Sequence, residues 1–211
     1  MNLYLTTITL NPADQDAVAD LDDVQRLHRR LMLLAPDDLG DNARRAAGVL
    51  FRIEQDADTT QILVQTRTEP DASRFPVGYG DFECRDIGPV LERLEPGTEV
   101  AYRITVNPSK RLAVDEGPGK LQVFKGAAAD EWWTERATTC GLELGEFSSV
   151  VLPEAIGKKG PDPRRWIHHV LRRFDGTATV TDPDAVREAV QTGIGRAKAF
   201  GAGLLSLRVA E

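Results

Sequence analysis

The sequence of 211 residues predicts an α+β fold made of two similar units in tandem. Three observations lead to this prediction. Segments in which apolar and polar residues alternate, as they do in strands, are interspersed with segments in which apolar residues recur at helical spacing. Turn signals such as Pro96-Gly97 separate these segments. At 41% hydrophobic, the chain can also bury a substantial core.

The first half contains the elements of one complete unit. Its main helix is predicted from Val24, Leu27 and Leu31, which recur at helical spacing. In chain order we expect a strand at 3–10, a helix at 23–34, strands at 49–54 and 61–66, a short helix at 86–94 and a strand at 100–106. The order β-α-β-β-α-β is that of a ferredoxin-like domain, which we assign to residues 1–107.

A second ferredoxin-like domain is expected at residues 108–211. Asp182-Pro183 marks the start of a helix, because aspartate can accept hydrogen bonds from the free N–H groups and proline fits the first turn. The expected elements are a weakly marked first strand at 121–124, a helix at 129–140, a strand at 147–152, an extended pair spanning 166–180, a helix at 182–191 and a last strand beginning at Leu204. No low-complexity linker separates the two domains, so we expect them to pack tightly.

A glycine-rich loop precedes the last strand. It contains the pairs Gly193-Ile-Gly195 and Gly201-Ala-Gly203, with Arg196 and Lys198 between them. Glycine permits positive φ and close backbone approach, so the loop is either a cradle for phosphate oxygens or a connection through a crowded core. It does not match the P-loop or dinucleotide templates, which makes those nucleotide folds poor candidates.

Charge is distributed unevenly along the chain. The formal net charge of −7 argues against an indiscriminate nucleic-acid binder, because Lys and Arg provide most of the affinity for phosphates. Residues 11–23 contain five aspartates and no cation, whereas residues 157–173 contain six Lys and Arg residues and one acid. We expect a positive patch in the second segment. The acidic remainder of the chain is expected to be a solvated surface, with repulsion of unintended nucleic acid or contact with other proteins as the alternatives.

Composition also indicates the cellular compartment. The chain has no apolar run of about 18 residues that could span a membrane, and its start does not resemble a signal peptide. We therefore expect a cytoplasmic protein without membrane contact. Cys84 and Cys140 are too few for a disulfide framework and are interpreted as reduced packing residues.

Several motifs together resemble a known family. They are Asn11-Pro12 after the first strand, His28-Arg29 in the first helix, Gln65-Thr-Arg-Thr-Glu-Pro70, Arg103-Ile-Thr-Val-Asn107-Pro108-Ser-Lys110-Arg111 and the terminal Gly201-Ala-Gly203-Leu-Leu-Ser-Leu207. The two Gly-x-Gly pairs are similar to the signature of the RAMP superfamily of CRISPR-associated RNA-binding proteins. The whole set resembles the CasE family, the CRISPR RNA-processing endoribonucleases of type I-E systems, over nearly the full length.

The resemblance implies a function. It implies a metal-independent endoribonuclease that cleaves precursor CRISPR RNA at the 3′ base of the repeat hairpin and leaves a 2′,3′-cyclic phosphate and a 5′-hydroxyl. The enzyme would stay on the product hairpin and join the other subunits of the Cascade complex. No cofactor and no metal are expected. His168-His169 does not change this, since adjacent residues of a strand point to opposite faces.

The resemblance places the catalytic group at His28. Histidine titrates near neutrality and can give or take a proton, although helical spacing alone favours a structural histidine beside the apolar stripe. Arg29 is expected to offset charge on the phosphorane, with a surface cation as the alternative. Family members often carry a tyrosine where this chain has Gln25, whose amide can hydrogen-bond but cannot donate a proton as a phenol does. Whether Tyr4, Tyr79 or Tyr102 substitutes for it stays open.

RNA binding is expected in the basic segments. By resemblance, a basic hairpin that includes Lys158-Lys159-Gly160 grips the stem, with a solvated loop as the alternative interpretation. The predicted RNA-binding residues are Lys110, Arg111, Lys158, Lys159, Arg164, Arg165, Arg196 and Lys198, beside the glycine-rich loop Gly193, Gly195, Gly201 and Gly203. At least one of Trp132 and Trp133 is expected in the core.

Two other functions stay open. One is a noncatalytic RNA-binding scaffold subunit of the RAMP superfamily, which the absent tyrosine favours. The other is a ferredoxin-like protein that binds a small ligand or nucleotide through the glycine-rich loop.

Overall fold

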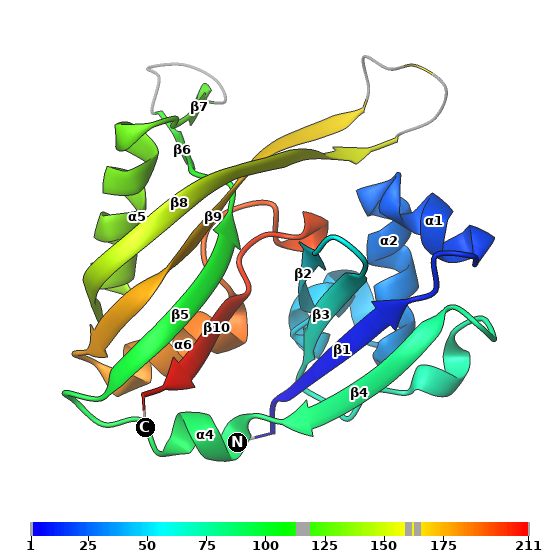
Figure 1. Ribbon diagram of the computed structural model, residues 1–211, viewed down its shortest axis with the longest axis horizontal. Helices are drawn as coiled ribbons and strands as arrows, with labels where there is room; N and C mark the ends of the chain where they lie inside the picture. The colour runs from blue at the N-terminus through cyan, green and yellow to red at the C-terminus, as the bar shows by residue number, and fades with distance from the viewer. Residues whose placement is uncertain (1, 113–118, 159–161, 163–165, 211) are drawn as a thin grey trace.

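The computed structural model describes residues 2–112, 119–158, 162 and 166–210. These residues form two four-stranded antiparallel sheets, one from each half of the chain, and a two-stranded ribbon. In Figure 1 the two sheets lie side by side, and the long β8–β9 pair extends from the second half over the first. Each sheet has the strand order of a ferredoxin-like domain, so the predicted α+β fold of two tandem ferredoxin-like domains is confirmed.

The first sheet has the order β2-β3-β1-β4 and is covered on one face by helices. Its elements are β1 (Tyr4–Leu10), α1 (Gln15–Leu21), α2 (Val24–Leu31), the 3₁₀ helices η1 (Met32–Leu34) and η2 (Gly40–Asn42), α3 (Ala43–Ala47), β2 (Leu50–Gln55), β3 (Thr60–Thr66), η3 (Ala72–Arg74) and β4 (Gly80–Asp86). Leu27 and Leu31 of α2 are fully buried against Ile8, Ile62 and Val64 of the sheet. This apolar stripe is the one that predicted the helix.

The second sheet has the order β10-β5-β9-β8. Its elements are β5 (Glu99–Val106), α5 (Ala127–Thr139), β8 (Leu142–Gly157), β9 (Ile167–Val180), α6 (Pro183–Thr192), η5 (Lys198–Phe200) and β10 (Leu205–Val209). Helix α4 (Gly88–Glu92) joins the two sheets. The two-stranded ribbon consists of β6 (Ser109–Arg111) and β7 (Leu121–Val123). Asp182 caps α6 through its carboxylate, as predicted. The extended region 166–180 is one strand that pairs with β8, not a pair in itself.

The assignment of strands to domains needs a correction. We predicted that residues 100–106 complete the first domain, but β5 pairs with β9 and β10 of the second sheet. Its apolar side chains, Tyr102 and Ile104 among them, are buried in the second core. The segment at 121–124 pairs with β6 and is not a sheet strand of that domain. The chain therefore passes from one sheet to the other between Asp86 and Glu99, before the boundary that we placed at 107.

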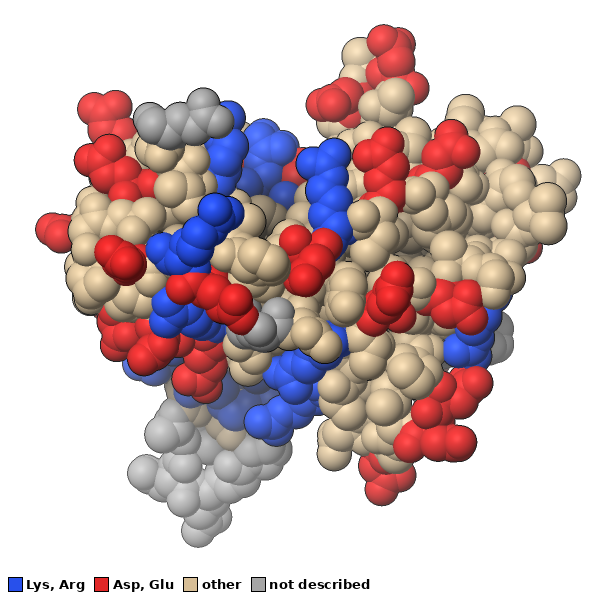
Figure 2. Space-filling model, turned by 90° about the horizontal axis from the view of Figure 1, so that it is seen from below, with Lys and Arg blue, Asp and Glu red and all other residues tan. Residues whose placement is uncertain are grey.

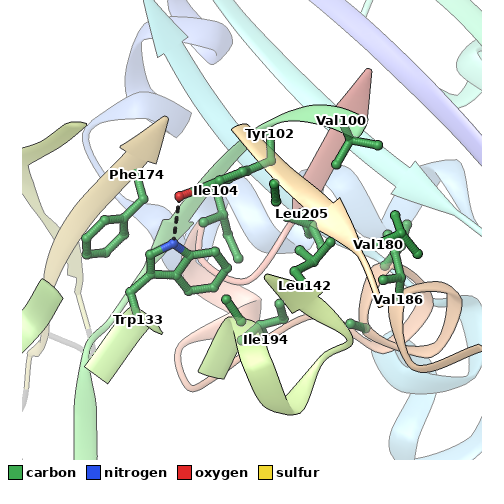
Figure 3. Close-up of a cluster of buried hydrophobic side chains, with 14 of the residues drawn as sticks. Val100, Tyr102, Ile104, Trp133, Leu142, Phe174, Val180, Val186, Ile194 and Leu205 are labelled. Carbon is green, nitrogen blue, oxygen red and sulfur yellow. Dashed lines mark hydrogen bonds between the residues drawn. The ribbon is translucent and has the colours of Figure 1, made fainter. Parts of the chain in front are cut away.

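The second core is built around aromatic side chains (Figure 3). Trp133 is fully buried, its indole N–H donates to the Tyr102 hydroxyl at 3.0 Å, and its ring stacks on Phe174 with centroids 5.7 Å apart. Trp132 is buried as well. Both tryptophans therefore belong to the core.

Polar contacts between the domains are buried. Arg52 of β2 is 3% exposed, and its Nη1 donates to the backbone carbonyls of Leu204 at 3.2 Å and Arg103 at 3.3 Å. Gln65 of β3 is fully buried and donates to the carbonyl of Val190 at 2.9 Å. Buried polar groups of this kind fix the relative position of two surfaces, because each needs its partner. The expectation of tight packing is confirmed.

Candidate active site

Ion pairs hold α2, the helix that carries His28, against α1. Asp20 is fully buried, and its carboxylate accepts from Nε of Arg26 and, at 2.7 Å, from Nε of Arg30. The Tyr79 hydroxyl donates to the same carboxylate at 3.2 Å. Asp16 pairs with both arginines as well. The acidic segment 11–23 is therefore not simply a solvated surface: two of its aspartates hold α1 against α2, and Asp14 and Asp23 cap these helices.

His28 and Gln25 present unused polar atoms on neighbouring turns of α2. The imidazole of His28 is partly buried, and Nδ1 has no hydrogen-bond partner among the described residues. The same holds for Oε1 of Gln25, three residues earlier and therefore on the same side of the helix. Buried polar atoms without partners are uncommon in folded proteins, and a catalytic or binding role is one explanation for such an atom. The structure thus brings together two of the predicted catalytic residues.

Burial and charge act together on the imidazole. Burial, and to a lesser degree the positive charge of Arg44, lowers the pKa of His28 from the ordinary value of about 6.5. Arg44 belongs to α3, is itself partly buried, and donates to the carbonyl of Val49 at 3.0 Å. Arg29, the predicted electrostatic partner, is exposed, and its Nε donates to the carbonyl of Gln25 at 3.4 Å. Arg44 could not be recognised from the sequence, because no motif signals the approach of α3 to α2.

The glycine-rich loop lies between the domains and beside α2. Its segment η5 packs against α2 and against β2. Gly193, Gly201 and Gly203 are buried and Gly195 is exposed. The loop's backbone is engaged: the N–H of Gly203 donates to Thr105 at 2.7 Å and the N–H of Ile194 donates to Gly203 at 3.0 Å. The loop matches a connection through a crowded core better than an open phosphate cradle.

The two predicted cations of the glycine-rich loop differ in how exposed they are. Arg196 is exposed, and its backbone forms a bridge with Asn107. Lys198 is partly buried and donates to the carbonyl of Thr192 at 2.9 Å; burial, followed by the charges of Arg44 and Arg45, lowers its pKa. Its charge therefore lies near Arg44, the cation that acts on His28.

The other predicted cations belong to the β6–β7 ribbon or to the sequence that follows β8. Lys158 is exposed at the end of β8 and lies over the Trp166 ring at 5.9 Å, while Lys159, Arg164 and Arg165 fall outside the described residues. Lys110 and Arg111 are exposed on β6, which Figure 1 places on the far side of the second domain from α2. Of the described cations named in this paragraph, Lys158 is therefore the one next to the candidate site.

Two of the three tyrosines that could replace the phenol missing at position 25 are bound to other side chains. Tyr79 is bound to Asp20, and burial together with that carboxylate raises its pKa above the ordinary tyrosine range. Tyr102 accepts from Trp133 within the second core, where burial raises its pKa to about 12. Both phenols are therefore buried and hydrogen-bonded to other side chains, Tyr79 to Asp20 and Tyr102 to Trp133.

The adjacent histidines face in different directions, as predicted. His168 lies 3.4 Å from Glu154, and His169 stacks on Phe200 with centroids 5.0 Å apart. Across the described ranges, no group of three or more His, Cys, Asp and Glu side chains is arranged to hold a metal ion. Cys140 packs against the second core, but Cys84 is exposed on β4, so the packing role predicted for it is wrong.

Figure 2 shows the molecule from below, the side opposite to the end where β8 and β9 pass over the first domain. Acidic side chains are spread over this face, with Lys and Arg interspersed among them. This face therefore does not offer the continuous positive surface that a phosphate backbone requires. In the part of the chain that the structure describes, no helix is long and apolar enough to cross a bilayer.

Known proteins resemble this chain over its full length. The family model described as CRISPR associated protein matches residues 3–208. The CRISPR-associated endoribonuclease Cse3 of Thermus thermophilus is 31% identical over 97% of this chain and 99% of its own length. A structure of Thermus thermophilus Cse3 bound to an RNA representing a pre-cleavage complex is 30% identical, with a TM-score of 0.82 over 99% of this chain and 100% of that one.

A third similarity comes from an assembly. One chain of a CRISPR RNA-guided surveillance complex in a pre-nicking state is 37% identical, with a TM-score of 0.73 over 98% of this chain and 100% of that one. The family that the sequence motifs indicated is thereby confirmed. The chain belongs to the family of CRISPR-associated proteins that includes the endoribonuclease Cse3.

Proposed function

We infer that the chain is an endoribonuclease that cleaves precursor CRISPR RNA at the 3′ base of the repeat hairpin without a metal ion. One observation carries this proposal: a partly buried histidine, whose Nδ1 has no partner among the described residues, lies close enough to Arg44 for that charge to act on it. Its relatives include a named endoribonuclease and a chain bound to a pre-cleavage RNA, which supports the same activity.

His28 is the proton-transfer group in this proposal. Because its pKa is lowered, the imidazole is mostly neutral at pH 7 and can accept the proton of the 2′-hydroxyl as that oxygen attacks phosphorus. The bond from phosphorus to the 5′-oxygen breaks, and the departing oxygen takes up the proton that His28 has accepted. The products are a 2′,3′-cyclic phosphate and a 5′-hydroxyl, so atoms and charge balance.

The neighbouring residues support the transition state. Arg44, Arg29 and Lys198 supply positive charge for the phosphorane, whose negative charge exceeds that of the phosphodiester. The free Oε1 of Gln25 accepts a hydrogen bond from the substrate and thereby orients it. No role as proton donor is assigned to Gln25, since an amide is not acidic enough.

The RNA stem is held by Lys158 and the cations that follow it in sequence. Duplex RNA is recognised through its shape and backbone, and cations on a ribbon suit that task. Since β8 ends against α2, a stem bound there brings its base close to His28. We further propose that the protein keeps its product hairpin and takes a place in a Cascade complex. The similarity to a surveillance-complex chain supports this.

The test uses a synthetic RNA with the hairpin repeat of the host's own CRISPR array. In EDTA, the parent protein is expected to cut it once, and an RNA with a 2′-deoxy group at the scissile nucleotide is expected to stay intact. His28→Ala should reduce the single-turnover rate at least about 100-fold and leave RNA affinity nearly unchanged.

Other outcomes separate the alternatives. Tight binding of the hairpin by the parent without cleavage would support a noncatalytic scaffold, which the glutamine at position 25 favours. Cleavage that persists in His28→Ala would move the catalytic group elsewhere.

A further inference from the structure

Asp23 joins two parts of the molecule that come from different domains. Its Oδ1 accepts from the N–H groups of Gln25 at 3.0 Å and Arg26 at 3.3 Å, as expected of a residue that caps a helix. The same oxygen also accepts from the N–H of Lys158 at 3.1 Å. The cap of α2 requires only the first two bonds. The third comes from the end of β8 and needs a separate explanation.

The end of β8 also packs directly on the first turn of α2. A Cβ placed on Gly157 would lie 3.4 Å from Cβ of Gln25 and 3.6 Å from Cγ2 of Val24. Val24 in turn is buried with Ala155 of β8 and Leu171 of β9 in a small apolar cluster. An added methyl group would thus be in ordinary contact with α2, so the end of β8 lies next to the first turn of this helix, and the hydrogen bond from Lys158 is a polar contact that joins them.

This contact lies between the predicted RNA-binding segment and the catalytic residue. Lys158 is the first residue after β8, and His28 follows Asp23 by five residues on a helix of only eight. A short helix moves as one body, so a shift at its first turn also displaces the imidazole. A displacement of about 1 Å at a reacting group can reduce a rate about 100-fold.

We propose that Asp23 is a positioning residue: by holding the N–H of Lys158, it sets where His28 stands relative to RNA bound on the β8–β9 pair. This inference rests on the proposed function. It concerns the rate of the chemical step and not RNA affinity, because the carboxylate accepts backbone hydrogen bonds and does not need to touch RNA.

The experiment removes the cross-domain bond from either side. Lys158→Pro deletes the N–H and leaves Asp23 and the helix cap in place. Lys158→Ala is its matched control, since it removes the same cation but keeps the N–H. From the other side, Asp23→Ser still caps α2 but carries its acceptor closer to the backbone and away from Lys158, whereas Asp23→Asn keeps an acceptor at the original place.

Each variant is assayed with saturating repeat-hairpin RNA under single-turnover conditions, with RNA affinity and the melting temperature measured in parallel. We expect Lys158→Pro to cut at least about tenfold more slowly than Lys158→Ala. Asp23→Ser should show a similar loss, and Asp23→Asn should restore most of the parent rate. Affinity should be equal within each pair.

Equal rates in both pairs would overturn the inference while leaving the proposed function intact. A loss confined to RNA affinity would also overturn the inference, because the β8–β9 pair would then serve only to bind the RNA. If the parent protein itself does not cleave, the proposed function and this inference fail together. Asp23→Ser can also lower stability, because it alters the cap of α2. Lys158→Pro leaves that cap untouched, so the comparison of Lys158→Pro with Lys158→Ala still tests the inference if Asp23→Ser does not fold.

Discussion

His28 has its imidazole partly buried, with Nδ1 unpaired among the described residues and the Arg44 guanidinium nearby, and this environment sets the pH range in which the proposed proton transfer can occur. Both burial and the positive charge of Arg44 disfavour the imidazolium form. A base with a lowered pKa stays neutral to a lower pH, so cleavage should persist below pH 6.5 before its acid limb is reached.

Replacing Arg44 by methionine tests this explanation. Loss of the cation raises the pKa of His28 toward 6.5, so the acid limb of the single-turnover rate should move to higher pH. Arg29→Met is the control, because Arg29 does not contribute to the lowered pKa of His28 and the limb should stay in place. The measurement is the rate between about pH 5 and 8. An acid limb that does not move in Arg44→Met would contradict the assigned cause.

The site residues differ in how far the sequence could reveal them. His28 was found because the resemblance placed it, although helical spacing alone favoured a structural role. Arg44 and Asp23 carry no such signal. Their significance depends on α3 and the end of β8 approaching α2, contacts between segments that are distant in sequence.

At the scale of elements, the glycine-rich loop shows how backbone conformation fixes a connection. Gly193 ends α6 with φ 74° and ψ 161°, a region that residues with a side chain essentially do not occupy. A Cβ at this position would lie 2.8 Å from the side chain of buried Leu50 and 3.1 Å from the carbonyl of Gly203. The position therefore requires glycine for its conformation and for its surroundings.

Gly193→Ala is expected to lower the free energy of unfolding by roughly 3 kcal/mol, at the upper end of the range for backbone strain because the added methyl group also has no room. Gly78→Ala is the control: its φ is 86° but the space around it is open, so the loss should be about 1 kcal/mol. Urea denaturation measures both. Equal losses would mean that close packing against the first domain contributes nothing.

Elements with an apolar stripe or a clear capping signal were the most predictable. α2 was found from the spacing of its apolar residues, and α6 from the capping Asp182 and the proline that follows it. β4 was missed because most of it is exposed and its polar residues leave no alternation to detect. α1 was missed since ion pairs from Asp16 and Asp20, and not an apolar face, hold much of it in place.

At the scale of the whole molecule, Arg52 is a buried side chain that binds the first domain to the second. It is 3% exposed, pairs with Glu54 at 2.7 Å and donates across the interface to Leu204, Arg103 and Ser206. Removing one partner of a buried polar network leaves the others without compensation.

Arg52→Met should therefore lower the free energy of unfolding by about 3 kcal/mol. Arg85→Met provides the comparison: Arg85 and Glu83 are 81% and 74% exposed and 3.8 Å apart, so the loss should stay below about 1 kcal/mol. Chemical denaturation of the full chain measures the two. A loss in Arg52→Met as small as that in Arg85→Met would show that the interface does not depend on this residue.

The order in which the site's parts occur along the chain also has a consequence during synthesis. Helix α2 leaves the ribosome early, whereas β8 and η5, which pack on it, belong to the second half, and β10 completes the sheet beside β5 only at the end. A nascent chain that has just produced His28 lacks every contact from the second domain. If the proposed function holds, the site around His28 is thus complete only after nearly all of the polypeptide has been translated, and we expect unfinished chains not to cut RNA.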